Sequence, residues 1–360
     1  MSFEQLNKII EDGMEGKNQS IPIGLPKLGM YANIRKNVLT LIFSSTGCGK
    51  SSMLDTMILS ACNDYMLHPS ENKLKPDFQL FSMERSKIMR IAKWLSHIIF
   101  TQEGVEIQLP KMLGWWENKL TREEHSLIRK YEDYITQLLN DFITIHDGAK
   151  TPNEIYRVMK DHFEENGQYS EEIIKGKKHK IYVPSNPNLV TIPCFDHGNL
   201  TKTTKELPTK KQAIDKLVEY AQGFRDLESC SPIWISQINR SISSVTRLKD
   251  QEQELLLEDV KESGDIGDAC DIAISLYDPL KYKQSSRTGY DPNDFATGNG
   301  AYFRSAQILK SSYGADNLRV PLAFNGFCGQ FKELPTKKSL SDEQYNILVE
   351  SVLNKSYFLE

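Results

Sequence analysis

The sequence predicts an α/β fold with a mostly parallel central sheet and helices packed on its faces. From residue 38 onward, apolar runs that look like strands alternate with segments whose apolar residues recur at helical spacing. The composition is that of an ordinary globular protein, with 360 residues, 39% hydrophobic and 26% charged. A chain of this length is sufficient for one large α/β domain or two smaller ones.

Eight apolar runs are predicted to form the strands. The first of them is rich in strand formers and has the continuous apolar character of a buried parallel strand. The eight runs lie at residues 38–43, 78–83, 142–146, 190–195, 232–238, 271–277, 303–310 and 319–324.

Helices are predicted between these runs. Thr121, Thr151 and Ser341 each stand three residues before a Glu or Gln, which is the spacing of a capping box. Pro152 follows Thr151 at the first helical position, where proline is favoured. Residues 4–13 are expected to form a short amphipathic helix.

We expect three parts along the chain. They are an N-terminal arm or linker helix over residues 1–20, a core domain over 21–330 and a helical tail over 331–360. Within the core, residues 167–189 read as a charged hairpin insertion, and residues 285–300 read as a polar loop. The basic tip of the hairpin at 175–180 is either a solvated turn or an arm that contacts phosphates.

Composition excludes several classes of protein. No apolar run approaches the ~18 residues that a membrane span requires. Six scattered cysteines without C-x-x-C spacing indicate neither a zinc ribbon nor a disulfide framework, which fits a reducing, cytoplasmic location. The net charge of −4 means that any binding of nucleic acid would be local.

Residues 44–52, SSTGCGKSS, nearly match the phosphate-binding pattern G-x-x-x-x-G-K-[ST]. Ser44 replaces the first glycine, which a small residue can do if its φ stays negative. The strand before and the helical pattern after the loop are the context that the motif requires. Cys48 either reacts with thiol reagents or fills a permissive position. The predicted nucleotide-binding residues are Ser45, Thr46, Gly47, Cys48, Gly49, Lys50, Ser51 and Ser52.

Each part of this loop has a predicted task. Gly47 and Gly49 let backbone N–H groups face the phosphates, with the helix N-terminus adding its dipole. Lys50 would reach the β- and γ-phosphates, and the Ser51 hydroxyl would ligate Mg²⁺. Chemistry of this kind requires a nucleotide such as ATP together with Mg²⁺.

Three other strands end in polar side chains. Asp196 follows the run 190–195 and is the candidate to hold Mg²⁺ with Ser51. Glu84 follows another run and is the candidate base for an attacking water, while Gln237 could sense the γ-phosphate. Because the carboxyl ends of parallel strands share one edge of a sheet, we expect these side chains to meet there. Alternatively, each is an ordinary polar residue at a strand exit.

The motifs resemble those of one known family. FSMERS at 81–86 resembles its F-S-L-E-M-S, and KESGDI at 261–266 resembles its R-E-S-G-S-I. Over roughly residues 20–330 the motifs follow the order seen in the DnaB-like replicative helicases, which are hexameric RecA-type motors. The full set is GLPKLG (24–29), LIFSSTGCGKSS (41–52), FSMERS (81–86), CFDHGNL (194–200), ISQINRS (235–241), DVKESGDIGDACD (259–271) and ILKSSYG (308–314).

The resemblance implies a RecA-like P-loop core and assigns roles to single residues. Lys50, Ser51, Glu84, Asp196 and Gln237 take the roles given above. Lys261, Glu262 and Gly264 would lie in the loop that follows single-stranded DNA through the hexamer pore. A further set either lines the pore or belongs to a solvated loop: Arg240, Arg247 and Lys249.

The sequence also departs from the family. The helical domain that engages primase in bacterial members has no counterpart among the roughly twenty residues before the core, and His-Gly-Asn follows Asp196 where the family has Tyr-Leu-Gln. The K-x-R that reaches the neighbour's nucleotide reads Lys310-Ser-Ser312. A hairpin centred between Gly314 and Ala315 would place Lys310 opposite Arg319, and Arg319 would then supply the missing guanidinium.

Two functions follow. The first is an ATP-driven hexameric DNA helicase that translocates on single-stranded DNA, in contact with a primase or a helicase loader. The second is a RecA-like ATP-binding accessory with weak ATPase activity, which assembles on DNA in recombination or helicase loading without unwinding it.

Overall fold

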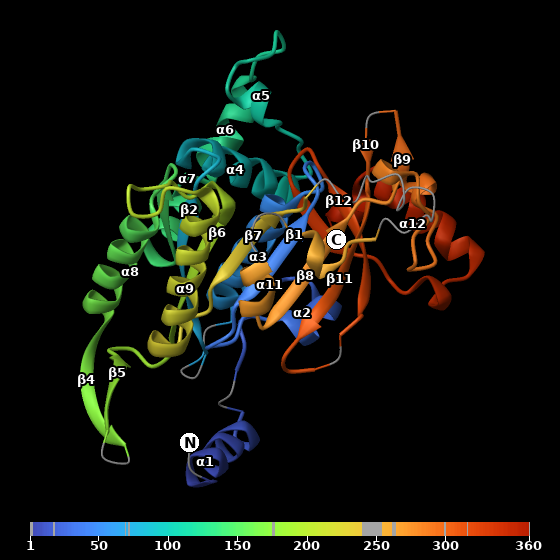
Figure 1. Ribbon diagram of the computed structural model, residues 1–360. Coiled ribbons are helices and arrows are strands. Elements are labelled where there is room, and N and C mark those ends of the chain that lie inside the picture. The colour runs from blue at the N-terminus through green and yellow to red at the C-terminus, as the bar shows by residue number, and fades with distance from the viewer. Residues whose placement is uncertain are drawn as a thin grey trace.

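The computed structural model describes residues 3–16, 19–68, 70, 73–174, 177–239, 254–260, 264–298, 300–314 and 316–359. Its centre is a nine-stranded sheet in the order β13-β12-β11-β8-β1-β7-β6-β2-β3 (Figure 1). The strands are β1 (Thr40–Ser44), β2 (Lys75–Ser82), β3 (Ile143–Asp147), β6 (Leu189–Asp196), β7 (Ile233–Gln237), β8 (Ile272–Tyr277), β11 (Phe303–Ser311), β12 (Arg319–Asn325) and β13 (Gln330–Glu333).

The sheet has a parallel part and an antiparallel part. From β3 to β8 every neighbouring pair is parallel, whereas β11, β12 and β13 add on in antiparallel pairs. The predicted α/β class with a mostly parallel sheet and a C-terminal β-hairpin is therefore confirmed. All eight predicted runs form strands of this sheet.

Helices cover both faces of the sheet, because apolar side chains along β1 point alternately to one face and the other. Ile42 joins the apolar cluster beneath α3 and α4, while Leu41 and Phe43 join the cluster beneath α8 and α9. The helices are α1 (Phe3–Met14), α2 (Pro26–Ala32), α3 (Lys50–Leu67), α4 (Lys87–Glu103), α5 (Leu109–Met112), α6 (Arg122–Lys130), α7 (Glu132–Asp141), α8 (Pro152–Asn166), α9 (Lys210–Glu228), α11 (Gly264–Ala269) and α12 (Asp342–Leu353).

The three predicted capping boxes are present. Thr121, Thr151 and Ser341 cap α6, α8 and α12, and in each the side chain at the third helical position bonds back to the cap. Short 3₁₀ turns complete the chain at η1 (Gly198–Leu200), η3 (Leu257–Asp259), η4 (Leu280–Tyr282), η5 (Pro292–Phe295), η6 (Lys337–Ser339) and η7 (Ser356–Phe358).

Several elements lie outside the sequence prediction. α2 and α9 were not predicted, and the polar region 285–300 contains η5 and the small strands β9 (Ala296–Thr297) and β10 (Gly300–Ala301). β13 pairs with β12 and continues across residue 330, where the core was expected to end. The hairpin insertion forms a separate ribbon of β4 (Gly167–Ile174) and β5 (Lys177–Pro184), which projects from the body in Figure 1.

Candidate nucleotide-binding site

The sheet topology gathers the candidate side chains on one edge. Ser44 at the end of β1 lies beside Gln237 at the end of β7. On the neighbouring strands, Asp196 at the end of β6 lies beside Ser82 at the end of β2, two residues before Glu84. β6 and β7 are themselves paired, so the carboxyl ends of all four strands are consecutive.

The phosphate loop connects β1 to α3 and depends on two glycines with positive φ. Gly47 has φ 82° and Gly49 has φ 104°, a region that side-chain-bearing residues rarely adopt. A Cβ at Gly49 would lie 2.8 Å from Phe331 Cζ, so the rings of β12 and β13 also require glycine there. Ser44 is fully buried and is not among the residues with positive φ, so it fits the position of the first glycine.

Lys50 and Ser51 begin α3 and contact the other parts of the site. Lys50 Nζ donates to Ser44 O at 3.1 Å and Ser45 O at 3.0 Å, so the side chain folds over its own loop. Burial lowers the pKa of Lys50 to about 8, and a bound phosphate would favour the charged form. Ser51 Oγ donates to Asp196 Oδ1 at 3.0 Å, which pairs the two candidate Mg²⁺ ligands.

Asp196 is held by a buried arginine that the sequence prediction missed. Arg90 Nη1 lies 2.7 Å from Asp196 Oδ2, and Arg90 Nε lies 2.9 Å from Asp55 Oδ1. Trp94 Nε1 donates to the same Asp55 oxygen at 2.8 Å. Burial favours protonation of Asp196, but the charge of Arg90 and the hydrogen bonds from Arg90 and Ser51 hold the pKa of this carboxyl below its usual value. Asp196 is therefore an ionised, oriented carboxylate.

Glu84 and Gln237 line the cavity above the phosphate loop, whose volume is about 380 Å³. Glu84 Oε2 lies 2.7 Å from Nε2 of His197, the residue after Asp196. Arg85 and Lys93 add positive charge that the sequence prediction did not assign to the site. The cavity is lined by Thr46, Gly47, Gly49, Lys50, Ser51, Ser52, Glu84, Arg85, Lys93, His197, Gln237, Phe324 and Gly326.

The donor set fits a magnesium ion bound with a nucleotide. A hydroxyl and a carboxylate are hard oxygen ligands, and Mg²⁺ is held by few protein oxygens together with phosphates and water. Among the described residues, no group of three or more His, Cys, Asp and Glu side chains could hold a metal alone. Phosphate oxygens would therefore have to complete the coordination beside Ser51 and Asp196.

Comparison with solved structures decides the fold family. Over 93% of this chain and 99% of the other, the structure matches a solved ATPase domain with a TM-score of 0.68 and 18% identity. It also matches a DnaB-like replicative helicase, solved in a study of its interactions with primase, with a TM-score of 0.66 and 18% identity. That match covers 93% of this chain and 67% of the helicase. The fold is that of a DnaB-like helicase ATPase domain. No protein-family model and no curated protein matches the sequence.

Of the two alternatives for Cys48, reaction with thiol reagents is wrong. Cys48 is fully buried, donates its S–H to Leu276 O at 3.3 Å and does not line the cavity. Burial raises the pKa of its thiol to about 11, so Cys48 is not open to thiol reagents. Arg304 of β11 supports the same turn, because its Nε donates to Cys48 O at 3.3 Å.

The predicted register of the C-terminal hairpin is also wrong. Arg319 pairs with Gln307, not with Lys310. The ladder ends at Ile308, where Asn317 N–H donates to Ile308 O at 2.7 Å, and Lys310 lies beyond it. The loop between β11 and β12 is therefore longer than the predicted tight turn at residue 314. As a result, the partner of Arg319 is three residues earlier in β11 than predicted.

Lys310 and Arg319 both have partners within the chain. Lys310 Nζ donates to Gly267 O at 3.0 Å and Asp268 O at 2.8 Å, near the end of α11. Arg319 Nη2 lies 3.1 Å from Glu254 Oε2. Among the described residues that line the cavity of this chain, neither of the two is found.

Most of the residues that we predict to contact DNA lie outside the described residues: Arg240, Arg247, Lys249, Lys261 and Glu262. Gly264 begins α11. The described residues next to these gaps contact one another. Ile238 and Val260 form an antiparallel bridge, and Asn239 N–H donates to Asp259 O at 2.8 Å. The described residues 238–239 and 259–260 therefore lie side by side, directly after Gln237 in the chain.

In the hairpin insertion, several charges are compensated within the ribbon. Lys178 Nζ lies 2.7 Å from Glu171 Oε2, and Lys180 Nζ lies 3.8 Å from the centre of the Tyr169 ring. Tyr169 in turn donates to Glu228 of α9 at 2.7 Å and anchors the base of the ribbon. Tip residues 175 and 176 lie outside the described residues, so the phosphate-contacting arm stays a prediction.

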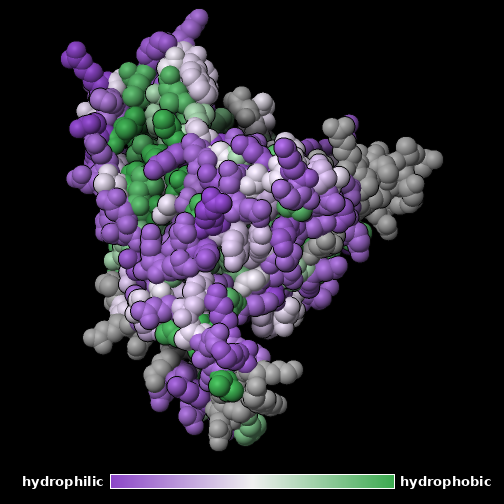
Figure 2. Space-filling view, turned by 60° about the vertical axis from the view of Figure 1, so that its left-hand side comes forward, coloured by the Kyte–Doolittle hydropathy of each residue, from purple (hydrophilic) through white to green (hydrophobic). Residues whose placement is uncertain are grey.

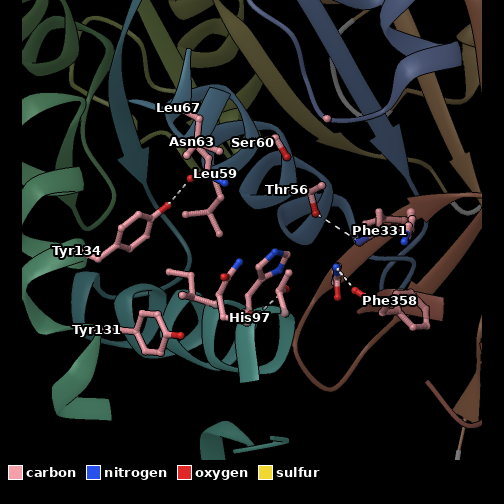
Figure 3. A pocket seen from close by; sticks show the side chains of 16 residues that line it. Thr56, Leu59, Ser60, Asn63, Leu67, His97, Tyr131, Tyr134, Phe331 and Phe358 are labelled. Carbon is pink, nitrogen blue, oxygen red and sulfur yellow. Dashed lines mark hydrogen bonds between the residues drawn. The ribbon is translucent and has the colours of Figure 1, made fainter. Parts of the chain in front are cut away.

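A second cavity of about 420 Å³ lies between α3, α4, α7 and β13, and its described lining residues differ from those of the first (Figure 3). Aromatic, hydroxyl and amide groups line most of it, and burial lowers the pKa of His97 to about 4, which leaves that ring neutral. At its edge, Phe331 N–H donates to Thr56 Oγ1 at 3.4 Å and ties β13 to α3. The weak positive charge of this cavity makes it unsuited to a triphosphate.

Proposed function

We propose that this protein is an ATP-hydrolysing motor that translocates on single-stranded DNA as a hexamer, in the manner of a replicative helicase. The observation that carries the proposal is the shared sheet edge. It brings the phosphate loop, the Ser51–Asp196 pair and Glu84 around one cavity. Within the described residues, no helix is long and apolar enough to span a bilayer.

The proposed chemistry assigns one step to each group. Lys50 and the loop N–H groups would bind the phosphates of ATP. Ser51 and Asp196 would hold Mg²⁺, and the bound ion would neutralise charge on the phosphates. Glu84 would accept a proton from the attacking water, and Gln237 would contact the γ-phosphate.

The proposed DNA contacts begin beside Gln237. Arg240, Arg247 and Lys249 follow Ile238 in the chain, and Lys261, Glu262 and Gly264 follow Val260. Ile238 and Val260 are joined by an antiparallel bridge. Loss of the γ-phosphate would alter the contacts of Gln237, which directly precedes this bridge at the end of β7. We infer that this connection couples hydrolysis to movement along DNA.

Assembly into a ring would complete the site. Lys310 and Arg319 are not among the described residues that line the cavity of their own chain, so we assign them to the neighbour's nucleotide. Exposed apolar surface is available for assembly on α1, where Phe3 and Met14 are 75% and 84% exposed. Figure 2 shows further apolar side chains gathered in the upper left of the face that it presents. A primase or a helicase loader is the proposed protein partner.

One experiment separates this function from the alternative. ATPase activity is measured with and without single-stranded DNA, and the mass of the assembly is measured in ATP. A ring whose ATPase activity is stimulated by DNA supports the motor. DNA binding with little turnover supports the weak ATPase accessory, which the partners of Lys310 and Arg319 within the chain would favour.

A further inference from the structure

His197 occupies an unusual position between the two carboxylates of the candidate site. It follows Asp196 at the end of β6, and Met83 N–H donates to Asp196 O at 2.8 Å, so β2 and β6 remain joined up to this point. Just beyond that bond, His197 Nε2 lies 2.7 Å from Glu84 Oε2 and 3.6 Å from Asp196 Oδ1. The side chain is only 6% exposed, whereas that of Glu84 is 49% exposed.

The surroundings of the ring determine where its proton lies. Nε2 faces two carboxylate oxygens, which can only accept hydrogen bonds when ionised, so Nε2 carries the hydrogen. Nδ1 is buried and has no hydrogen-bond partner in the part of the chain that the structure describes. A hydrogen on Nδ1 would therefore be a buried donor without an acceptor, which is costly. The geometry is that of a neutral imidazole that donates from Nε2 to Glu84.

Glu84 gains orientation from this bond. It lies on the short connection between β2 and α4, and a half-exposed glutamate otherwise samples many rotamers. A base that activates water must be held within hydrogen-bond reach of that water. The bond from His197 occupies Oε2 and leaves Oε1 to accept the proton.

We propose that His197 is a positioning residue for hydrolysis, which holds Glu84 by Oε2 so that Oε1 can take the proton of the attacking water. The inference rests on the proposed function. In that step the water oxygen bonds to the γ-phosphorus, its proton moves to Glu84, and the bond to the β-phosphate oxygen breaks with its electrons leaving on ADP. His197 donates a hydrogen bond throughout and neither gains nor loses a proton.

Two variants of similar size separate the hydrogen bond from the packing. His197→Gln keeps an N–H donor near the position of Nε2, and His197→Met fills similar space without one. In DNA-stimulated steady-state assays, His197→Met is expected to lower kcat about tenfold or more, with KM for ATP changing less than about twofold. His197→Gln is expected to retain most of the parent kcat. His197→Phe provides a second variant without the donor in case His197→Met folds poorly.

Measurements of binding and folding distinguish loss of Glu84 positioning from loss of ATP binding or of stability. ATP affinity and the thermal unfolding midpoint should be similar in the His197→Gln and His197→Met variants. In a Glu84→Gln background, His197→Met should lower the residual rate no further, because the group that it positions is gone. A parent-like or faster His197→Met enzyme would overturn the proposal, as would equal loss of kcat in the Gln and Met variants. If Glu84→Gln itself hydrolyses ATP normally, the proposed function fails instead.

Discussion

The candidate residues at the carboxyl edge of the parallel strands have partners of a different kind from those of the candidate residues on the β11–β12 hairpin. At the edge they contact one another, as in the Ser51–Asp196 and Glu84–His197 pairs. On the hairpin, Lys310 contacts backbone carbonyls near α11 and Arg319 contacts Glu254. One chain therefore brings the candidate nucleotide-binding residues together, while the residues proposed to act on a neighbour have other partners.

The ion pairs of the two regions also differ in burial, and burial determines how costly each pair is to break. Arg90 and Asp196 are 1% and 3% exposed, and a buried pair is costly to break because one charge would remain uncompensated. Arg319 and Glu254 are 28% and 25% exposed. A solvent-exposed ion pair contributes about 1 kcal/mol or less, so we propose that a neighbour's phosphate displaces Glu254 on assembly. The contacts of the first region are therefore harder to break than the Arg319–Glu254 pair of the second.

The largest effect is expected at the carboxyl edge. Lys50→Ala should abolish ATP binding, because it removes the cation that reaches the phosphates. Glu84→Gln should bind ATP normally and lose most hydrolysis, because only the water-activating charge is removed. Equilibrium binding of a slowly hydrolysed ATP analogue and steady-state hydrolysis check the two variants. Equal loss of binding in both would show that the roles are wrongly assigned.

The next largest effect is expected on the hairpin. Arg319→Ala should bind ATP like the parent and hydrolyse it about 10³-fold more slowly, the effect of a missing arginine finger. Adding Lys50→Ala subunits, whose Arg319 is intact, should restore activity at mixed interfaces. Glu254→Gln is the matched control, since it removes the partner within the chain and leaves Arg319 available. Hydrolysis by Arg319→Ala at the parent rate would exclude this residue as the finger.

A smaller effect is expected on DNA binding. Lys261→Ala should weaken binding of single-stranded DNA several-fold, and the salt dependence of the parent should be shallow, because few phosphates are contacted per subunit. Fluorescence anisotropy over a salt series measures both. A steep dependence that persists in monomers would instead indicate the basic hairpin tip at 175–180.

The smallest effect concerns stability within the phosphate loop. Gly47 and Gly49 both have positive φ, but of the two only Gly49 faces the rings of Phe324 and Phe331. Gly47→Ala should therefore cost about 1 kcal/mol of unfolding free energy and Gly49→Ala about 2–4 kcal/mol. Denaturant unfolding of the nucleotide-free protein gives the difference. Equal costs would mean that backbone strain alone requires the glycine at 49.

Sequence reasoning found the parts of the site that depend on strand order and local motifs. A phosphate loop, three capping boxes and polar residues after strands are patterns along the chain, and parallel pairing brings the strand ends together. Arg90 was missed because its contacts with Asp55 and Asp196 join α4 to α3 and β6, a relation without fixed spacing. The hairpin register was missed because it depends on how the chain returns after Ile308.

We propose that a single chain binds ATP, whereas turnover requires the assembly. The most direct test measures ATP affinity and hydrolysis per chain over a range of protein concentrations, with the mass of the particles determined in the same samples. We predict a constant affinity and a turnover per chain that rises in step with the assembled fraction. A turnover per chain that stays constant from monomer to ring would contradict the claim.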